Sequence, residues 1–151
     1  MVHIVLVEPE IAPNTGNIAR LCAATGTRLH LVGRLGFRLD DRSLRRAGCD
    51  YWDRVDAVVH ADWAAFTRAL PANRRLALSA RARRPYTRVQ YQDGDCLVFG
   101  SESRGLPAAI LERDPELALT IPMPGGGVRC LNLATAAGIV LYEALRQIHR
   151  W

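Results

Sequence analysis

Short apolar runs alternate along the chain with segments in which apolar residues recur at helical spacing. Six runs have the length of strands buried in a sheet, namely residues 3–7, 29–32, 55–59, 74–79, 96–99 and 117–121. Helical patterns occupy residues 18–25, 41–47, 62–70 and 132–147. Strands that alternate with helices predict an α/β fold with a mostly parallel sheet, and residues 1–151 are expected to form a single domain.

The residues between these runs support the proposed boundaries. A polar segment that begins with Pro13 opens the first helix, and Gly26 stands where a C-terminal cap is expected. Asp62 is placed to cap the helix at 62–70. The polar and aromatic stretch 80–95 shows no regular pattern, and we expect a mobile loop there.

The last predicted helix, residues 132–147, carries apolar residues around its whole circumference, so it must be covered on more than one side. Before it, the strand at 117–121 stops at Pro122, and the glycines at 125–127 free the backbone. Residues without a Cβ let backbone groups approach a small molecule closely. A ligand-binding loop is one interpretation of this segment, and a glycine turn before a buried helix is the other.

Two further polar groups follow strand ends, where open α/β sheets bind ligands. Asn14, Asn17 and Arg20 are spaced by three after the first strand, and the alternative is an N-cap with solvated helix residues. Glu102 and Arg104 lie in a turn flanked by glycines after the strand at 96–99, and the alternative is a structural ion pair.

Composition places the chain in a reducing compartment. The four cysteines, Cys22, Cys49, Cys96 and Cys130, include no close pair, so we expect free thiols and a cytoplasmic protein. The chain start lacks a basic leader, and no apolar run approaches the roughly 20 residues that a membrane span requires. We therefore expect a soluble protein with no membrane partner.

All 20 basic residues are arginine, and the formal net charge is +5. A coding bias explains the missing lysine, and so does selection for bidentate phosphate contacts. The positive balance itself favours an anionic partner, with nucleic acid first. Five arginines fall in residues 34–46, with Phe37, Tyr51 and Trp52 nearby, and a second basic group falls in residues 81–88. Either group suits an RNA backbone or is a solvated surface.

Several chemistries find no support in the residues. A phosphate-binding loop of nucleotide triphosphatases needs a lysine, and the chain has none. The glycines at 125–127 match a dinucleotide fingerprint only in part, because Cys130 stands at its third glycine. The four histidines belong to no recognisable nucleophile motif, and no paired ligands predict a metal.

Three segments resemble the three motifs of the SPOUT RNA methyltransferases. They are residues 14–20 (Asn-Thr-Gly-Asn-Ile-Ala-Arg), residues 99–107 (Phe-Gly-Ser-Glu-Ser-Arg-Gly-Leu-Pro), and residues 121–133 from Ile-Pro-Met to Asn-Leu. Shorter matches at 8–10, 36–37, 40–41, 44–48, 50–51 and 91–95 extend the likeness over nearly the whole chain. The chain is most similar to the small bacterial enzymes that methylate the ribose 2′-hydroxyl of the tRNA wobble nucleotide.

This resemblance implies helices on both faces of the sheet, a C-terminal trefoil knot and S-adenosylmethionine as cofactor. It implies S-adenosylhomocysteine as product, no metal, and a cytidine or modified uridine in leucine tRNAs as substrate. The cofactor-binding positions that it implies are Leu78, Gly100, Ile121, Met123, Cys130 and Leu131. Cys130 replaces the serine of most relatives and Thr135 an asparagine, which keeps a catalytically inactive RNA-binding protein as the alternative.

The resemblance also assigns roles to polar residues. We expect Arg20 to lead catalysis, but a guanidinium keeps its proton, so holding the phosphate and ribose is the favoured role over that of a base. Asn14 and Asn17 are expected to fix the loop and Glu102 the opposite wall. The arginines expected to bind tRNA are Arg42, Arg45, Arg46, Arg81, Arg84 and Arg129.

The last helix predicts a homodimer, because one sheet covers only one of its sides. The residues expected to face a partner subunit, at three- and four-residue spacing, are Ala134, Gly138, Tyr142 and Leu145. Those expected to face the chain's own sheet are Leu133, Ala137, Val140, Ala144 and Ile148. The resemblance agrees, since its members dimerise through this helix.

Overall fold

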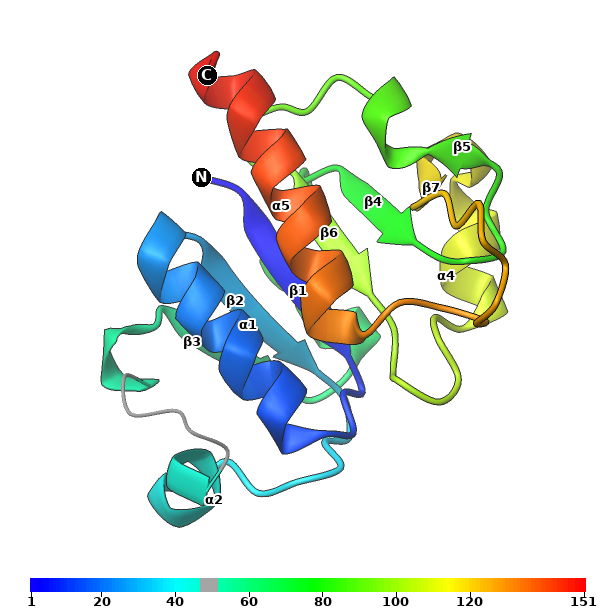
Figure 1. Cartoon of the computed structure of the whole chain (residues 1–151). Helices are drawn as coiled ribbons and strands as arrows, with labels where there is room; N and C mark the ends of the chain where they lie inside the picture. Colours follow the sequence, from blue (N-terminus) through cyan, green and yellow to red (C-terminus); the bar gives the residue numbers. More distant parts are fainter. Residues whose placement is uncertain (47–51) are drawn as a thin grey trace.

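A computed structural model of the chain describes residues 1–46 and 52–151 (Figure 1). These residues form a seven-stranded sheet in the order β3-β2-β1-β6-β4-β7-β5, and every strand pair is parallel. The strands are β1 (His3–Val7), β2 (Arg28–Val32), β3 (Ala57–His60), β4 (Arg75–Leu78), β5 (Arg84–Pro85), β6 (Cys96–Phe99) and β7 (Ala118–Thr120). The predicted α/β fold is confirmed.

Helices cover both faces of the sheet. They are α1 (Ala12–Thr25), α2 (Asp41–Arg46), α3 (Trp63–Ala69), α4 (Ala108–Arg113) and α5 (Leu133–His149). Short 3-10 turns complete the chain at η1 (Trp52–Arg54), η2 (Tyr86–Arg88) and η3 (Pro115–Leu117). In Figure 1, α1 and α5 lie side by side on the near face. Phe66 of α3 packs in the core on the other face. Cys49 and Tyr51, and the parts of the family resemblance at 47–48 and 50, lie outside the described residues.

The alternation of side chains along the strands explains this layering. In β1, Ile4 and Leu6 point into the core beneath α1 and α5, while Val5 and Val7 point into the core beneath α3 and α4. Both sets are apolar because parallel strands are buried on both faces, and such strands read as continuous apolar runs. This is why residues 3–7 and 96–99 predict β1 and β6 without error at either end.

Two helices differ from the prediction. Helix α1 begins at Ala12, six positions before the predicted start, with Pro13 in its first turn, where proline's missing N–H is no loss. Asn14 and Asn17 are thus helical residues. No helix is predicted at 108–113, where α4 follows Pro107. Among the described helices, none combines the length and the apolar composition needed to cross a membrane.

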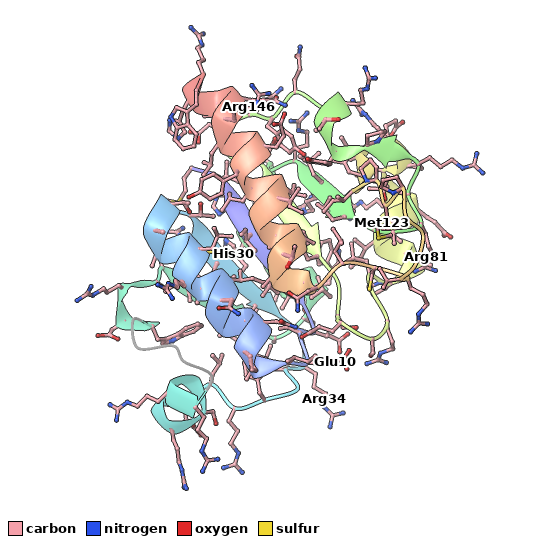
Figure 2. All side chains as sticks on the ribbon, viewed as in Figure 1. Glu10, His30, Arg34, Arg81, Met123 and Arg146 are labelled. Atoms are coloured by element: carbon pink, nitrogen blue, oxygen red, sulfur yellow. The ribbon has the colours of Figure 1, made fainter. Side chains whose placement is uncertain are left out.

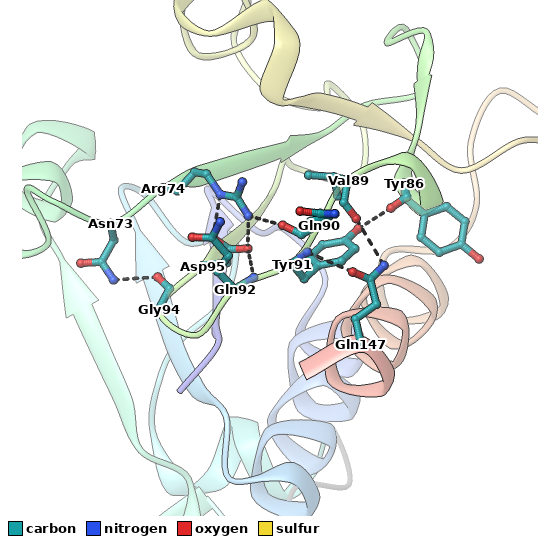
Figure 3. A network of polar contacts seen from close by, with 10 residues as sticks. All are labelled: Asn73, Arg74, Tyr86, Val89, Gln90, Tyr91, Gln92, Gly94, Asp95 and Gln147. Atoms are coloured by element: carbon teal, nitrogen blue, oxygen red, sulfur yellow. Dashed lines mark hydrogen bonds and ion pairs between the residues drawn. The ribbon is translucent and has the colours of Figure 1, made fainter. Parts of the chain in front are cut away.

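The expectation of a mobile loop at 80–95 is wrong, because this segment contains a strand of the sheet, and its second half is hydrogen-bonded to Arg74 and Gln147 (Figure 3). Arg84 and Pro85 form the edge strand β5, while Tyr91 is buried and its backbone N–H donates to Gln147 of α5 at 3.1 Å. Asp95, 2% exposed, accepts two hydrogen bonds from Arg74 at 2.9 and 2.7 Å. A buried ion pair and contacts to a neighbouring helix leave no signal in hydrophobic periodicity.

Candidate functional site

A cavity of about 320 Å³ lies at the carboxyl ends of three neighbouring strands, β4, β6 and β7. Its wall consists of residues at the ends of these strands and just after them, namely 78–81, 99–105, 120, 121 and 123, and it is closed by residues 129–131, 133 and 136 before and at the start of α5. Arg81 and Met123 mark its position in Figure 2. Open α/β sheets bind their ligands at this edge.

All six positions implied for the cofactor lie on this wall. They are Leu78, Gly100, Ile121, Met123, Cys130 and Leu131. They come from four segments that are separate in the sequence, and the fold brings these segments together around one cavity. Arg81 and Arg129 of the expected RNA-binding set also line the cavity. The structure thus gives these residues one location, while the roles assigned to them stay predictions.

Loop 100–105 is built so tightly that its first residue must be glycine. A Cβ on Gly100 would lie 2.0 Å from the carbonyl carbon of Gly105, and the two ends of the loop are bridged at Ser101 and Gly105. Gly105 itself has a φ of +68°, in the left-handed region that glycine tolerates. The loop therefore presents backbone groups and the side chain of Glu102 to the cavity in a fixed arrangement.

The chain leaves β1 through an unusual turn that leads to this loop. Glu8 has a φ of +51° although it is not glycine, and its N–H still donates to Val32 in β2 at 2.8 Å. Gly36 then packs against Glu10, where a Cβ would lie 2.7 Å from the Glu10 backbone. These contacts place Glu10 beside Ser103, whose hydrogen bonds lower the pKa of the Glu10 carboxyl.

Glu102 is held by the start of α1 rather than by Arg104. Its carboxylate accepts hydrogen bonds from the N–H of Glu10 at 2.9 Å, the N–H of Ile11 at 2.7 Å and the amide of Asn14 at 3.2 Å. No ion pair joins Glu102 to Arg104 among the described residues. The structural ion pair considered from the sequence is therefore wrong.

Asn14 is buried, and its side chain is not the N-cap of α1, a position that Ile11 occupies without a side-chain hydrogen bond. Its oxygen accepts from the side-chain amide of Asn132 at 3.0 Å. Asn132 caps α5, accepting from two backbone N–H groups. Sequence reasoning missed this role, although an asparagine directly before an apolar helix is a standard cap signal.

Asn17 and Arg20 lie farther along α1, and both side chains are exposed. In the part of the chain that the structure describes, hydrogen bonds connect Asn14 to the cavity loop but do not include Arg20. Within residues 1–46 and 52–151, no three side chains of histidine, cysteine, aspartate or glutamate are grouped to hold a metal ion. Arg20 is exposed and has no hydrogen bond or ion pair to the described residues, so it can contact an anionic ligand.

The two basic segments differ in how their arginines are engaged. Arg42, Arg45 and Arg46 are exposed on α2. Arg84, in contrast, donates to the backbone carbonyls of Glu116 at 2.8 Å and Arg88 at 2.6 Å. Its guanidinium therefore connects the edge strand β5 to two neighbouring turns. Of the aromatic residues expected to stack on a base, Trp52 packs partly buried against the core.

The residues of α5 that are predicted to face a partner subunit are exposed only in part, and the partner itself stays a prediction. Tyr142 is 48% exposed, and a Cβ on Gly138 would have no atom within 4 Å. Leu145 is buried in the chain's own core, so its assignment to a partner face is wrong. Leu141 is buried as well, so the buried face of α5 is wider than the predicted line of sheet-facing residues. The residues predicted to face the sheet and found buried are Leu133, Ala137, Val140 and Ala144.

Three histidines form a buried row on the opposite face of the sheet. His30 in β2 contacts His3 in β1 at 3.0 Å and His60 in β3 at 2.9 Å, ring nitrogen to ring nitrogen. Phe66 of α3 packs edge-on against His30 and His60. Burial disfavours the charged form of His30 and, with repulsion from the positive charges that His3 and His60 can carry, lowers its pKa to about 4. These side chains lie away from the cavity and pack as part of the core.

Comparison with known proteins gives consistent matches. The model of the SpoU rRNA Methylase family matches residues 1–142. The tRNA (cytidine(34)-2′-O)-methyltransferase of Escherichia coli strain K12 is 50% identical over 149 residues, which cover 98% of this chain and 94% of that protein. A solved structure described as giving insights into the 2-OH methylation of C/U34 on tRNA aligns with a TM-score of 0.93 at 50% identity, covering 100% of this chain and 98% of that chain. An AdoMet-bound rRNA methyltransferase from Sinorhizobium meliloti aligns with a TM-score of 0.83 at 27% identity, covering 96% of this chain and 56% of that chain.

Proposed function

Because the chain belongs to the SpoU rRNA methylase family, we propose that it transfers a methyl group from S-adenosylmethionine to a ribose 2′-oxygen of tRNA. The observation that carries the proposal is the cavity at the ends of β4, β6 and β7. Most of its wall is made by the second and third segments of the family resemblance, and Asn14 of the first segment is hydrogen-bonded to that wall.

The substrate position that we propose is the wobble nucleotide, a cytidine or modified uridine, in leucine tRNAs. The name of the Escherichia coli relative specifies cytidine 34, and the similar solved structure is described with C/U34. Half of the residues are identical to each of these proteins over nearly their full lengths. This extent of identity supports the same nucleotide for this chain more strongly than a likeness of fold would.

The cavity fits S-adenosylmethionine in size and in the chemistry of its wall. Its volume of about 320 Å³ is within the usual range for small-ligand pockets. Apolar side chains such as Leu78, Ile121 and Leu131 can cover the adenine, while backbone groups of loop 100–105 offer polar contacts. When bound, S-adenosylmethionine supplies a methyl group on a sulfonium, and the proposal requires no metal.

The chain's own residues bind and orient the RNA. Arg20 is exposed on α1 and carries a positive charge that can hold a phosphate and stabilise a hydroxyl as it loses its proton. Asn17, exposed one turn earlier, is placed to contact the same ribose–phosphate unit. Asn14 and Glu102 fix the start of α1 against the cavity loop.

The role of Arg20 is tested with Arg20→Lys, which keeps the charge but loses the planar fork. We expect a fall in kcat of about tenfold or more at saturating tRNA, since orientation contributes strongly to such reactions. Near-full turnover by Arg20→Lys would show that a point charge is sufficient and would contradict the proposed geometry.

We propose that tRNA phosphates contact the exposed arginines of α2. Each phosphate contact that is lost should reduce the slope of log affinity against log salt by up to about one unit. The test compares Arg45→Ala and Arg46→Ala with Arg113→Ala, an exposed arginine of α4 on the other side of the sheet. Equal slopes for all three variants and the unaltered protein would mean that α2 is only solvated.

We propose a homodimer that packs the exposed face of α5 against a second copy. Tyr142 and Trp151, 48% and 67% exposed, lie together on this face with ring centroids 6.3 Å apart. Exposed aromatic pairs of this kind are common at interfaces. Tyr142→Asp should lower the sedimenting mass and abolish methylation together. An unaltered protein that sediments as an active monomer would rule the dimer out.

The proposed activity is tested by incubating the protein with methyl-labelled S-adenosylmethionine and total tRNA, then locating the labelled nucleotide. We expect label in leucine tRNAs at the wobble ribose. Cofactor and tRNA binding without any label in RNA would favour the alternative, an inactive RNA-binding protein. No observation on the fold favours that alternative over the enzyme.

A further inference from the structure

A continuous row of hydrogen bonds connects the cavity loop to the starts of two helices. It runs from the carboxylate of Glu102 through the side-chain amide of Asn14 to that of Asn132. Glu102 lines the cavity, and Asn132 lies between two residues that also line it, Leu131 and Leu133. The row therefore begins at a residue of the cavity wall, passes through the first turn of α1 and ends at a residue whose two chain neighbours line the cavity.

Chemistry allows only one orientation for each member of this row. An ionised carboxylate only accepts hydrogen bonds, so Asn14 must turn its NH₂ group toward Glu102 and its oxygen toward Asn132. At the far end the backbone N–H groups of Ala134 and Thr135 only donate, so Asn132 must turn its oxygen to them. Its NH₂ group is then left facing Asn14, which agrees with the observed contact. An aspartate at either asparagine position would break this order.

We propose that Asn132 is a positioning residue that couples the cofactor cavity to the RNA-facing side of α1. A cofactor in contact with residues 129–133 fixes the start of α5, and Asn132 passes that constraint to Asn14. Arg20 lies six residues beyond Asn14 on the same rigid helix, about 9 Å along its axis. Loading of the cavity thereby sets the placement of the guanidinium proposed to hold the ribose–phosphate unit.

The burial of the two asparagines separates this role from a purely structural one. Asn14 is only 7% exposed, so a substitution there would disturb a buried position and remove one hydrogen bond each from Glu102 and Asn132. Asn132 is exposed, so water can replace its bond to Asn14 when it is removed. A change at Asn132 should therefore alter orientation without unfolding the protein.

The test variant is Asn132→Ser, because serine also caps helices but is too short to reach Asn14. The matched control is Asp62→Ser at the N-cap of α3, where Asp62 accepts from the N–H of Ala65 at 2.7 Å on the opposite face of the sheet. Both variants change a helix cap. Only Asn132→Ser removes the hydrogen bond between the start of α5 and α1, while the bond from Asn14 to Glu102 remains.

The first measurement is independent of methyl transfer. Side-chain amide signals of Asn14 are followed by NMR as S-adenosylhomocysteine is added. They should shift fully in the unaltered protein and in Asp62→Ser. In Asn132→Ser they should shift much less although the ligand binds, because only the contact through Glu102 remains. Signals that respond equally in Asn132→Ser would overturn the inference. Failure of S-adenosylhomocysteine to bind the unaltered protein would instead contradict the proposed function, on which the inference rests.

The second measurement is the effect of tRNA on the Kd for S-adenosylhomocysteine, and the reverse effect, which linkage requires to be equal. We expect a coupling of about fivefold or more in the unaltered protein, reduced toward one in Asn132→Ser. In the steady state kcat should fall about tenfold with KM for tRNA nearly unchanged. Unchanged coupling and kcat in Asn132→Ser, or an equal loss in Asp62→Ser, would show that Asn132 is only a cap.

Discussion

The row of buried histidines should make the protein lose stability below neutral pH. His3, His30 and His60 are 7%, 2% and 8% exposed, and burial lowers the pKa of all three, that of His30 to about 4 from 6.5. Each ring-to-ring contact uses one N–H and one lone pair, so neutral rings satisfy the row. Protonating two neighbouring rings would place two cations side by side, with ring centroids only about 5 Å apart.

The sign and size of the effect follow from linkage. Below pH 6.5 the unfolded chain binds protons at these positions and the folded chain does not, so the free energy of unfolding falls as pH falls. Each histidine that stays neutral only in the folded state removes about 1.4 kcal/mol per pH unit. At about pH 5.5 the loss is about 1.4 kcal/mol for His30 alone and at most about 4 kcal/mol for the three. For His30 the loss continues until its folded pKa of about 4 is reached.

The assay is urea unfolding followed by circular dichroism at fixed protein concentration, between about pH 7.5 and about pH 5.5, where ordinary carboxyls stay ionised. His30→Gln should be less stable at neutral pH but should lose less free energy on acidification. His149→Gln, at an exposed position of α5, should follow the unaltered protein. An equal acid loss in the unaltered protein and in His30→Gln would refute the reasoning.

Two further substitutions test the cavity loop and the anchored segment. Gly100→Ala should weaken S-adenosylhomocysteine binding by about tenfold or more in calorimetry, because its Cβ would overlap the backbone of loop 100–105. Gly125→Ala, with no atom within 4 Å of the added Cβ, should bind normally, and equal affinities would contradict this view of the loop. Arg74→Met should destabilise the protein by about 3–5 kcal/mol in urea, since it leaves the buried carboxylate of Asp95 without a cation. Arg28→Met at an exposed ion pair should cost less than about 1 kcal/mol, and similar losses for the two would refute the difference in burial.

The sheet could be predicted from the sequence because burial on both faces leaves continuous apolar runs. The start of α1 could not be, since the polar residues 13–17 show no apolar periodicity. The first turn of α1 is held by Glu102, which is 88 positions away from Asn14 in the chain. Local pattern carries no trace of such a contact.

The candidate site could be predicted from the sequence only in part. The resemblance to the SPOUT enzymes, and not periodicity, pointed to the cavity residues, and the trefoil knot that it implies stays a prediction. The contact between Asn14 and Asn132 joins residues 118 positions apart. The histidines of the buried row are separated by 27 and 30 positions and match no motif. Both arrangements depend on strand order, which the spacing of residues does not determine.

The most direct test of the proposed function is methyl transfer to a leucine tRNA whose wobble nucleotide alone lacks its 2′-hydroxyl. The unaltered protein should label the matching tRNA that carries the hydroxyl, with about one methyl group per molecule at saturation. The 2′-deoxy tRNA should bind with similar affinity, because its phosphates are intact, and should take up no label. Equal labelling of the two tRNAs would contradict transfer to the wobble ribose and would place the methyl group elsewhere on the RNA.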